Sequence, residues 1–167
     1  MSSLKLTETS YAVLGLLDLV EPATPYQLKQ VAQVSIFHFW SIPHTQLYTE
    51  CARLAEAGLL DEQREETGRR RRVYRLSKAG RKALADWRAD PETEIYELKD
   101  PGLLKLFCGA DPPSLAEAQL ERHERRLHAY TELADETDLP EGARLTLESG
   151  IGHEREYIRF WSRLKAG

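Results

Sequence analysis

The chain has 167 residues, of which 41% are hydrophobic and 30% charged, and its formal net charge is −4 at pH 7. This composition is typical of a folded globular protein and excludes a disordered one. We expect neither a membrane span nor a signal peptide, because no apolar run is long enough and the first residues lead directly into a capped helix. Cys51 and Cys108 lack metal-ligand spacing, so we expect a reduced, cytoplasmic protein with no metal or cofactor.

Charge is unevenly distributed along the chain. Residues 1–90 carry 13 Lys and Arg against 11 Asp and Glu, a net +2, whereas residues 91–167 carry 10 against 16, a net −6. Six of the 13 N-terminal cations lie between Arg64 and Arg75. Because acidic surfaces repel phosphates, any nucleic acid is expected to bind the first half of the chain.

Two capped helices are predicted in the first 33 residues. The first opens at Thr7 and is apolar nearly all round, which indicates a buried helix. Gly15 in its middle predicts a close helix contact, since an exposed Gly there costs about 1 kcal/mol relative to Ala. The second helix has Thr24 as its cap and Pro25 at its first position.

A hydrophobic connector leads to a third helix. We expect Val34–Trp40 to be packed and His38 within it to be structural. The third helix is predicted over 42–57, with Ser41 as its N-cap. Its apolar residues recur at helical spacing and would face a core: Leu47, Cys51, Leu54 and Ala55. Gly58 supplies the left-handed residue that ends it.

The opposite face of the third helix is polar and almost free of carboxylates. Amides and hydroxyls can bind base edges, and Arg, Tyr and Thr can hold phosphate oxygens. An ordinary amphipathic helix with a solvated face is the alternative interpretation. The residues of this polar face are His44, Thr45, Gln46, Tyr48, Thr49 and Arg53.

A basic hairpin follows the third helix. Residues 61–66 are polar and extended, Thr67-Gly68 is a turn signal, and Val73–Leu76 alternates at the strand period. Between them stand Arg69, Arg70, Arg71 and Arg72. Four adjacent cations repel one another, so DNA phosphates are a natural partner, with a solvated arginine loop as the alternative. The order of elements is that of a winged helix-turn-helix.

The second half is predicted to be helical. A Ser77-capped helix ends near Asp90, residues 90–100 form a joint, and Pro101 restarts a short helix. Two long helices close the chain and carry coiled-coil-like seams. These seams are Ala116, Leu120, His123, Leu127, Tyr130 and Ala134, then Leu147, Ile151, Ile158 and Trp161. Gly150 and Gly152 allow close backbone approach or interrupt the last helix. Burying this apolar surface needs the N-terminal half or a second copy of the chain.

Together these residues resemble the PadR family of bacterial transcriptional regulators. The resemblance covers about residues 8–90, and the second half looks like the helical C-terminal domain of the family's longer members. The residues that carry it are Val13–Leu17, Tyr26–Lys29, Leu47-Tyr48, Leu54, Gly58–Leu60, the basic wing and Tyr74–Gly80, then Glu97–Pro101 and Glu156–Trp161.

The resemblance implies a mainly α fold with a small β-hairpin wing. A winged helix-turn-helix DNA-binding domain would occupy residues 1–90, and an antiparallel helical dimerisation domain residues 91–167. Two departures affect DNA recognition: Thr24-Pro25 replaces the family's usual His-Gly, and the third helix lacks the glycine that often precedes its Thr-Leu-Tyr. An operator sequence therefore cannot be transferred.

The main hypothesis is a homodimeric regulator, a repressor, that binds an inverted repeat in double-stranded DNA. Thr45, Gln46 and Thr49 would face bases in the major groove, while Tyr48 and Arg53 hold phosphates. Arg69, Arg70, Arg71 and Arg72 would reach the adjacent minor groove or backbone.

Other interpretations remain open. Trp87, Tyr157 and Trp161 could line a small-molecule effector site, although aromatic residues on apolar faces are more often interface core. The winged helix could instead bind only an acidic protein partner. An enzyme is poorly supported, because the sequence shows no paired nucleophile and base, phosphate loop or metal cluster.

Overall fold

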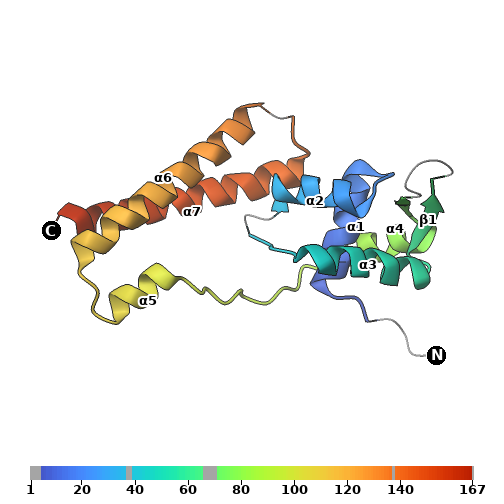
Figure 1. Cartoon of the computed structure of the whole chain (residues 1–167), viewed down its shortest axis with the longest axis horizontal. Coiled ribbons are helices and arrows are strands. Elements are labelled where there is room, and N and C mark those ends of the chain that lie inside the picture. The colour runs from blue at the N-terminus through green and yellow to red at the C-terminus, as the bar shows by residue number, and fades with distance from the viewer. Residues whose placement is uncertain (1–4, 37–38, 66–70, 137, 167) are drawn as a thin grey trace. The chain divides into compact units, whose positions relative to one another are not determined.

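The computed structural model describes residues 5–36, 39–65, 71–136 and 138–166. In chain order its elements are α1 (Glu8–Val20), α2 (Pro25–Gln33), α3 (His44–Glu56), β1 (Leu60–Arg64), β2 (Arg72–Leu76), α4 (Lys78–Ala89), α5 (Pro101–Phe107), α6 (Pro112–Glu136) and α7 (Glu141–Ala166) (Figure 1). The chain divides into two compact units, Met1–Glu94 and Ile95–Gly167. The expected fold class, mainly helical with one antiparallel hairpin, is confirmed.

Helix α1 is the centre of the N-terminal unit and packs against α2, α3, α4 and β2. Its start is fixed by a capping box, in which Thr7 and Ser10 exchange side-chain to backbone hydrogen bonds. The expected close contact at Gly15 is wrong, because a Cβ there would meet no atom within 4 Å. The close approach occurs at Gly80 of α4, where a Cβ would lie 2.1 Å from the carbonyl oxygen of Leu59.

The segment between α2 and α3 is less packed than its composition predicts. Thr24 caps α2 as expected, accepting a hydrogen bond from the backbone N–H of Gln27 at 3.3 Å. Beyond α2, however, Val34 and Phe39 are 59% and 61% exposed, and among the described residues of this segment Ile36 packs partly on the core. The expectation of a packed connector is therefore wrong for these residues, because the core is already filled by the helices. His38 lies outside the described residues.

Helix α3 begins two residues later than predicted. Its N-cap is Pro43, without a side-chain hydrogen bond, so the prediction of Ser41 as cap is wrong. The cause is steric, because a proline disfavours helical geometry in the residue before it. Pro43 therefore keeps Ile42 out of the helix, and the Ile42 side chain is buried in the core. The predicted stop is confirmed, since Gly58 has φ 75° and the N–H of Leu59 bonds back to the carbonyl of Leu54.

The wing is a two-stranded antiparallel sheet. β1 pairs with β2 in a register that runs from Leu60 opposite Leu76 to Arg64 opposite Arg72. Tyr74 also exchanges two backbone hydrogen bonds with Ala23, which ties the hairpin to the segment between α1 and α2. The turn that would join the strands lies outside the described residues.

In the C-terminal unit α6 and α7 lie side by side and antiparallel, with α5 packed on α6 (Figure 1). Ala116, Leu120 and Trp161 form a buried cluster between them. α7 is continuous through Gly150 and Gly152, and Gly150 allows the close approach of the Tyr130 ring, 3.2 Å from where a Cβ would stand. The C-terminal end of the seam predicted for α6 is not buried, since Ala134 is exposed.

None of the helices in the described part of the chain is both long and apolar enough to cross a membrane.

Candidate nucleic-acid interface

Helix α3 is held with its apolar side against the core of the N-terminal unit. Leu47, Cys51 and Leu54 are buried beneath it. This packing fixes the rotation of the helix about its axis and directs its other side to solvent. The exposed side carries His44, Thr45, Gln46, Tyr48 and Thr49, as the helical spacing predicted.

The exposed side chains differ in how free they are to bind. The Thr49 hydroxyl donates to the carbonyl oxygen of Thr45 at 2.9 Å, which leaves it to act as an acceptor. The rings of His44 and Tyr48 pack at 4.9 Å between centroids. The amide of Gln46 has no hydrogen-bond partner in the described residues, so both its donor and its acceptor are available to a base edge.

Arg53 lies where the sequence placed it, but its guanidinium is occupied. Its Nε and Nη2 atoms donate to the two carboxylate oxygens of Glu50 at 2.8 and 2.6 Å, and Nη2 also donates to Ser10 at 2.9 Å. Burial pushes the pKa of Glu50 upward, but the hydrogen bonds from Arg53 and Ser10 outweigh it and the net shift is downward. Arg53 thus joins α3 to α1, and a phosphate contact from it stays a prediction.

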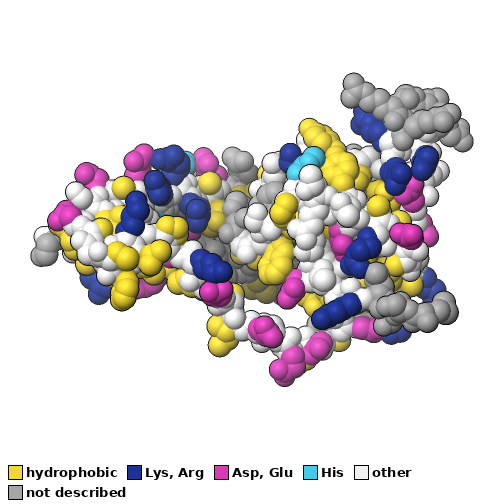
Figure 2. All heavy atoms as spheres, turned by 60° about the horizontal axis from the view of Figure 1, so that its bottom comes forward, with side chains coloured by type: hydrophobic (Ala, Val, Ile, Leu, Met, Phe, Trp, Pro, Cys, Tyr) yellow, Lys and Arg dark blue, Asp and Glu magenta, His cyan; other side chains and the backbone are white. Residues whose placement is uncertain are grey.

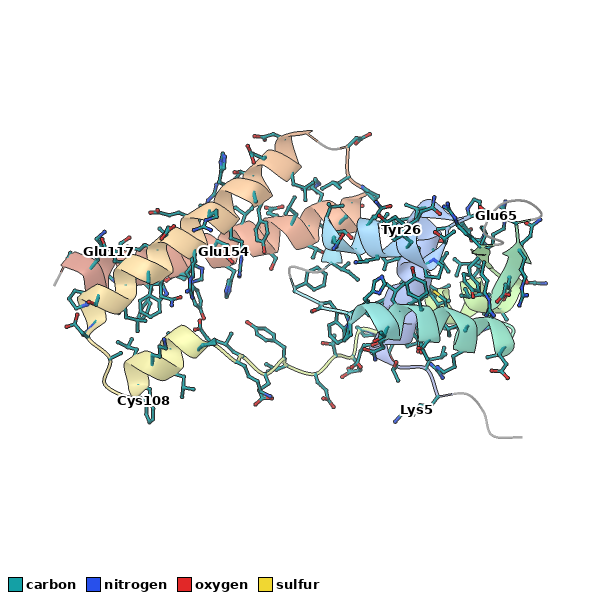
Figure 3. The ribbon with its side chains drawn as sticks, in the orientation of Figure 1. Lys5, Tyr26, Glu65, Cys108, Glu117 and Glu154 are labelled. Atoms are coloured by element: carbon teal, nitrogen blue, oxygen red, sulfur yellow. The ribbon has the colours of Figure 1, made fainter. Side chains whose placement is uncertain are left out.

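Arg71 and Arg72, the two described arginines of the predicted basic run, each face a glutamate. Arg72 lies 3.5 Å from Glu62, which also accepts a hydrogen bond from the Tyr74 hydroxyl at 3.1 Å. Arg71 lies 4.0 Å from Glu65, which is labelled beside the hairpin in Figure 3. The predicted contacts from Arg69 and Arg70 lie outside the described residues.

The three aromatic residues predicted for an effector site have different surroundings. Trp87 belongs to the N-terminal unit, where it stacks on Tyr11 at 4.7 Å between ring centroids. Trp161 is fully buried in the core of the C-terminal unit. Tyr157 lines a cavity of about 380 Å³ within the C-terminal unit.

A buried polar group between α6 and α7 was not predicted. Glu154 is 2% exposed, its Oε2 lies 2.5 Å from Nδ1 of His123, and its Oε1 lies 3.4 Å from Nη1 of Arg126 (Figure 3). The spacing contained the signal. Glu154 occupies a seam position of α7, because it lies three residues after Ile151 and four before Ile158. His123 lies on the seam of α6.

Comparisons with known proteins agree with this architecture. Residues 13–86 match the model of the Transcriptional regulator PadR-like family, and residues 98–166 match that of Virulence activator alpha C-term. The negative transcriptional regulator PadR of Bacillus subtilis is 24% identical to the chain, covering 93% of this chain and 94% of that protein.

Solved structures share the fold over nearly the whole chain. The crystal structure of Bacillus subtilis PadR in complex with operator DNA has a TM-score of 0.84 at 22% identity, covering 96% of this chain and 98% of that one. The same protein in complex with p-coumaric acid has a TM-score of 0.76 at 21% identity, with 97% of each chain covered. Residues 13–86 therefore form a domain of the PadR-like family of transcriptional regulators, and the chain as a whole shares the fold of the solved PadR structures.

Proposed function

We propose that the chain is a cytoplasmic repressor that binds an inverted-repeat operator as a homodimer. Residues 1–90 would bind the DNA, and residues 91–167 would pair two copies. The observation that carries this proposal is the exposed polar side of α3, held rigidly on the core beside an arginine-rich wing. The operator complex of the similar Bacillus subtilis protein, and its description as a negative regulator, support the same conclusion.

In this proposal α3 enters the major groove and the wing lies along the adjacent minor groove or backbone. Gln46 is the first candidate for a base contact, because its amide is unoccupied in the described structure, with Thr45 and Thr49 beside it. Tyr48 and the wing arginines would hold phosphates, which position the helix without specifying sequence. A two-fold axis would place the two copies of α3 about one helical turn of DNA apart, or a multiple of it.

The testing experiment is selection of duplexes from a random DNA pool by the purified full chain at physiological salt. We expect an inverted repeat, whose half-site spacing gives the distance between the two recognition helices. Gln46→Ala should then change the preferred bases within each half-site. Enrichment of a single unrepeated site would contradict the homodimer, and no enrichment would favour a winged helix that binds protein.

A small-molecule effector that releases the operator is part of the proposal, supported by the p-coumaric acid complex of the similar protein.

A further inference from the structure

One face of the wing brings two arginines together. In the register of β1 and β2, Arg64 lies directly opposite Arg72. Residues directly opposite each other on antiparallel strands have their side chains on the same face of the sheet, and like charges in such a pair repel. Both side chains are exposed, at 64% and 50%. The pair therefore concentrates positive charge, which an anion between the two guanidinium groups would stabilise.

Glu62 is the anion that the structure places there. Its Oε1 accepts a hydrogen bond from Nε of Arg64 at 3.4 Å, and its Oε2 lies 3.5 Å from Nη1 of Arg72. The hydroxyl of Tyr74, a buried residue directly opposite Glu62 in the sheet, donates to the same Oε2 at 3.1 Å. The carboxylate is thus anchored to the core, whereas the two arginines reach it from exposed positions.

Pairing of this kind makes the wing less basic than its arginine run suggests. Residues 60–76 carry six Arg against four Asp and Glu, a net +2. Beyond the ends of the two strands, Arg71 lies 4.0 Å from Glu65. Figure 2 shows Asp and Glu side chains next to Lys and Arg side chains on the visible face of the N-terminal unit. Arg64, Arg71 and Arg72 are therefore partly neutralised before any DNA is present.

A DNA phosphate would use the same hydrogen-bond donors as Glu62. Carboxylates and phosphates are both oxyanions, and arginine binds each through charge-assisted hydrogen bonds. Exposed ion pairs are weak, so a phosphate can displace the carboxylate from the arginines. The exchange nevertheless loses the contacts with Glu62, and the carboxylate that stays behind repels the phosphate. The affinity gained from each new phosphate contact is reduced by both effects.

We propose that Arg64 and Arg72 form a phosphate-binding pair of the wing, and that Glu62 occupies this pair in the free protein and thereby lowers its affinity for DNA. Arg64 precedes the turn and stands outside the basic run, so the sequence did not mark it as a DNA contact. The inference rests on the proposed function, since it needs the wing to lie along the DNA backbone. Because phosphate contacts carry no sequence information, Glu62 should affect operator and unrelated DNA alike.

The test compares Glu62→Gln with the unchanged full chain by fluorescence anisotropy, on the selected operator and on an unrelated duplex, at several salt concentrations. Glutamine keeps an oxygen that can accept from Tyr74, so the change removes the charge alone. We expect both duplexes to bind about threefold or more tightly at physiological salt. The slope of log affinity against log salt should steepen by about one, since one more phosphate is neutralised. Unchanged or weaker binding would overturn the proposal.

The matched control is Asp61→Asn, which removes the same charge from the neighbouring residue of β1. Asp61 is exposed, and because side chains alternate along a strand it lies on the other face of the sheet from Glu62. DNA affinity should therefore change by less than about twofold, since screening weakens charges that do not contact the arginine pair. An equal gain in this control would reduce the effect to net charge and overturn the site.

A second comparison isolates the two arginines. A chain with Arg64→Ala and Arg72→Ala should bind both duplexes more weakly, and adding Glu62→Gln should change its affinity by less than about twofold, because the charges that the carboxylate held are gone. A full gain in that background would overturn the proposal. If the unrelated duplex shows the expected effects but no operator is selected, the proposed function alone fails. A chain that binds neither duplex contradicts both.

Discussion

The guanidinium of Arg53 spans the carboxylate of Glu50, with two hydrogen bonds of 2.6 and 2.8 Å, and reaches the hydroxyl of Ser10 at 2.9 Å. Because Ser10 belongs to the first turn of α1, this contact fixes α3 against the central helix of the unit. The exposed side of α3 therefore owes its orientation partly to a residue that sequence pattern alone would assign to DNA.

The first prediction is that Arg53→Ala destabilises the fold. The change leaves Glu50, only 8% exposed, without its charged partner, which should lower the free energy of unfolding by about 2 kcal/mol. Urea unfolding at a fixed protein concentration measures this difference. Arg64→Ala is the control, because Arg64 is exposed and makes one contact of 3.4 Å with Glu62, so its loss should be under about 0.5 kcal/mol. Equal losses would contradict the assigned role.

The second prediction concerns acid stability. The pKa of Glu50 is lowered in the folded chain, because the hydrogen bonds from Arg53 and Ser10 outweigh the effect of burial. A group with a depressed pKa stabilises the fold above its unfolded pKa and loses that contribution as the pH falls through the folded value. Unfolding free energies of the chain and of Glu50→Gln should therefore converge as the pH falls below the usual range for a glutamate. A constant difference from neutral to acidic pH would contradict this.

The third prediction uses two glycines of the same unit. Gly80→Ala places a Cβ 2.1 Å from the carbonyl oxygen of Leu59, and because backbone must then move, we expect a loss of about 1–3 kcal/mol. Gly15→Ala meets nothing within 4 Å inside helix α1, and should raise stability by about 0.5–1 kcal/mol. Thermal unfolding of the two variants should shift in opposite directions, and a shared sign would show that the close approach at Gly80 is misassigned.

Features that depend on neighbouring residues in sequence were predictable here. The caps Thr7, Thr24 and Ser77 and the stop at Gly58 each use a side chain or a backbone conformation within a few residues of the helix end. The prediction of Ser41 as the N-cap of α3 was wrong for an equally local reason. The effect of Pro43 on the conformation of the residue before it outweighed the capping preference of serine.

Features that depend on packing between distant residues were not predicted. The Arg53–Ser10 hydrogen bond joins residues 43 positions apart, and polarity alone could not distinguish a guanidinium that bonds the protein from one that faces solvent. The Glu154–His123 pair was accessible in principle, because both residues occupy seam positions of paired helices.

The fourth prediction tests the wing through salt dependence. Replacing Arg70 and Arg71 by Ala should weaken binding to every DNA sequence and reduce the slope of log affinity against log salt by about 2, since each phosphate contact releases about one counterion. Affinity is measured at several salt concentrations on the selected operator and on a scrambled duplex. Arg159→Ala, an exposed arginine of α7 that pairs with Glu156, is the control and should leave the slope unchanged. Unchanged slopes for the wing variant would show that these arginines do not contact DNA.

The fifth prediction concerns the buried carboxylate of the C-terminal unit. Glu154→Ala removes the acceptor 2.5 Å from Nδ1 of His123 and leaves a cavity between α6 and α7, so we expect a loss of about 3–5 kcal/mol in unfolding free energy. Glu154→Gln keeps the volume and one acceptor oxygen, and should recover part of the loss. The control is Glu156→Ala, because Glu156 lies two residues away on the exposed side of α7. This change should alter the unfolding free energy by under about 0.5 kcal/mol. Because pairing of two copies would add to stability, all variants are compared at the same protein concentration. If Glu154→Ala unfolds like the Glu156 control, the pair with His123 does not stabilise the packing of α6 on α7.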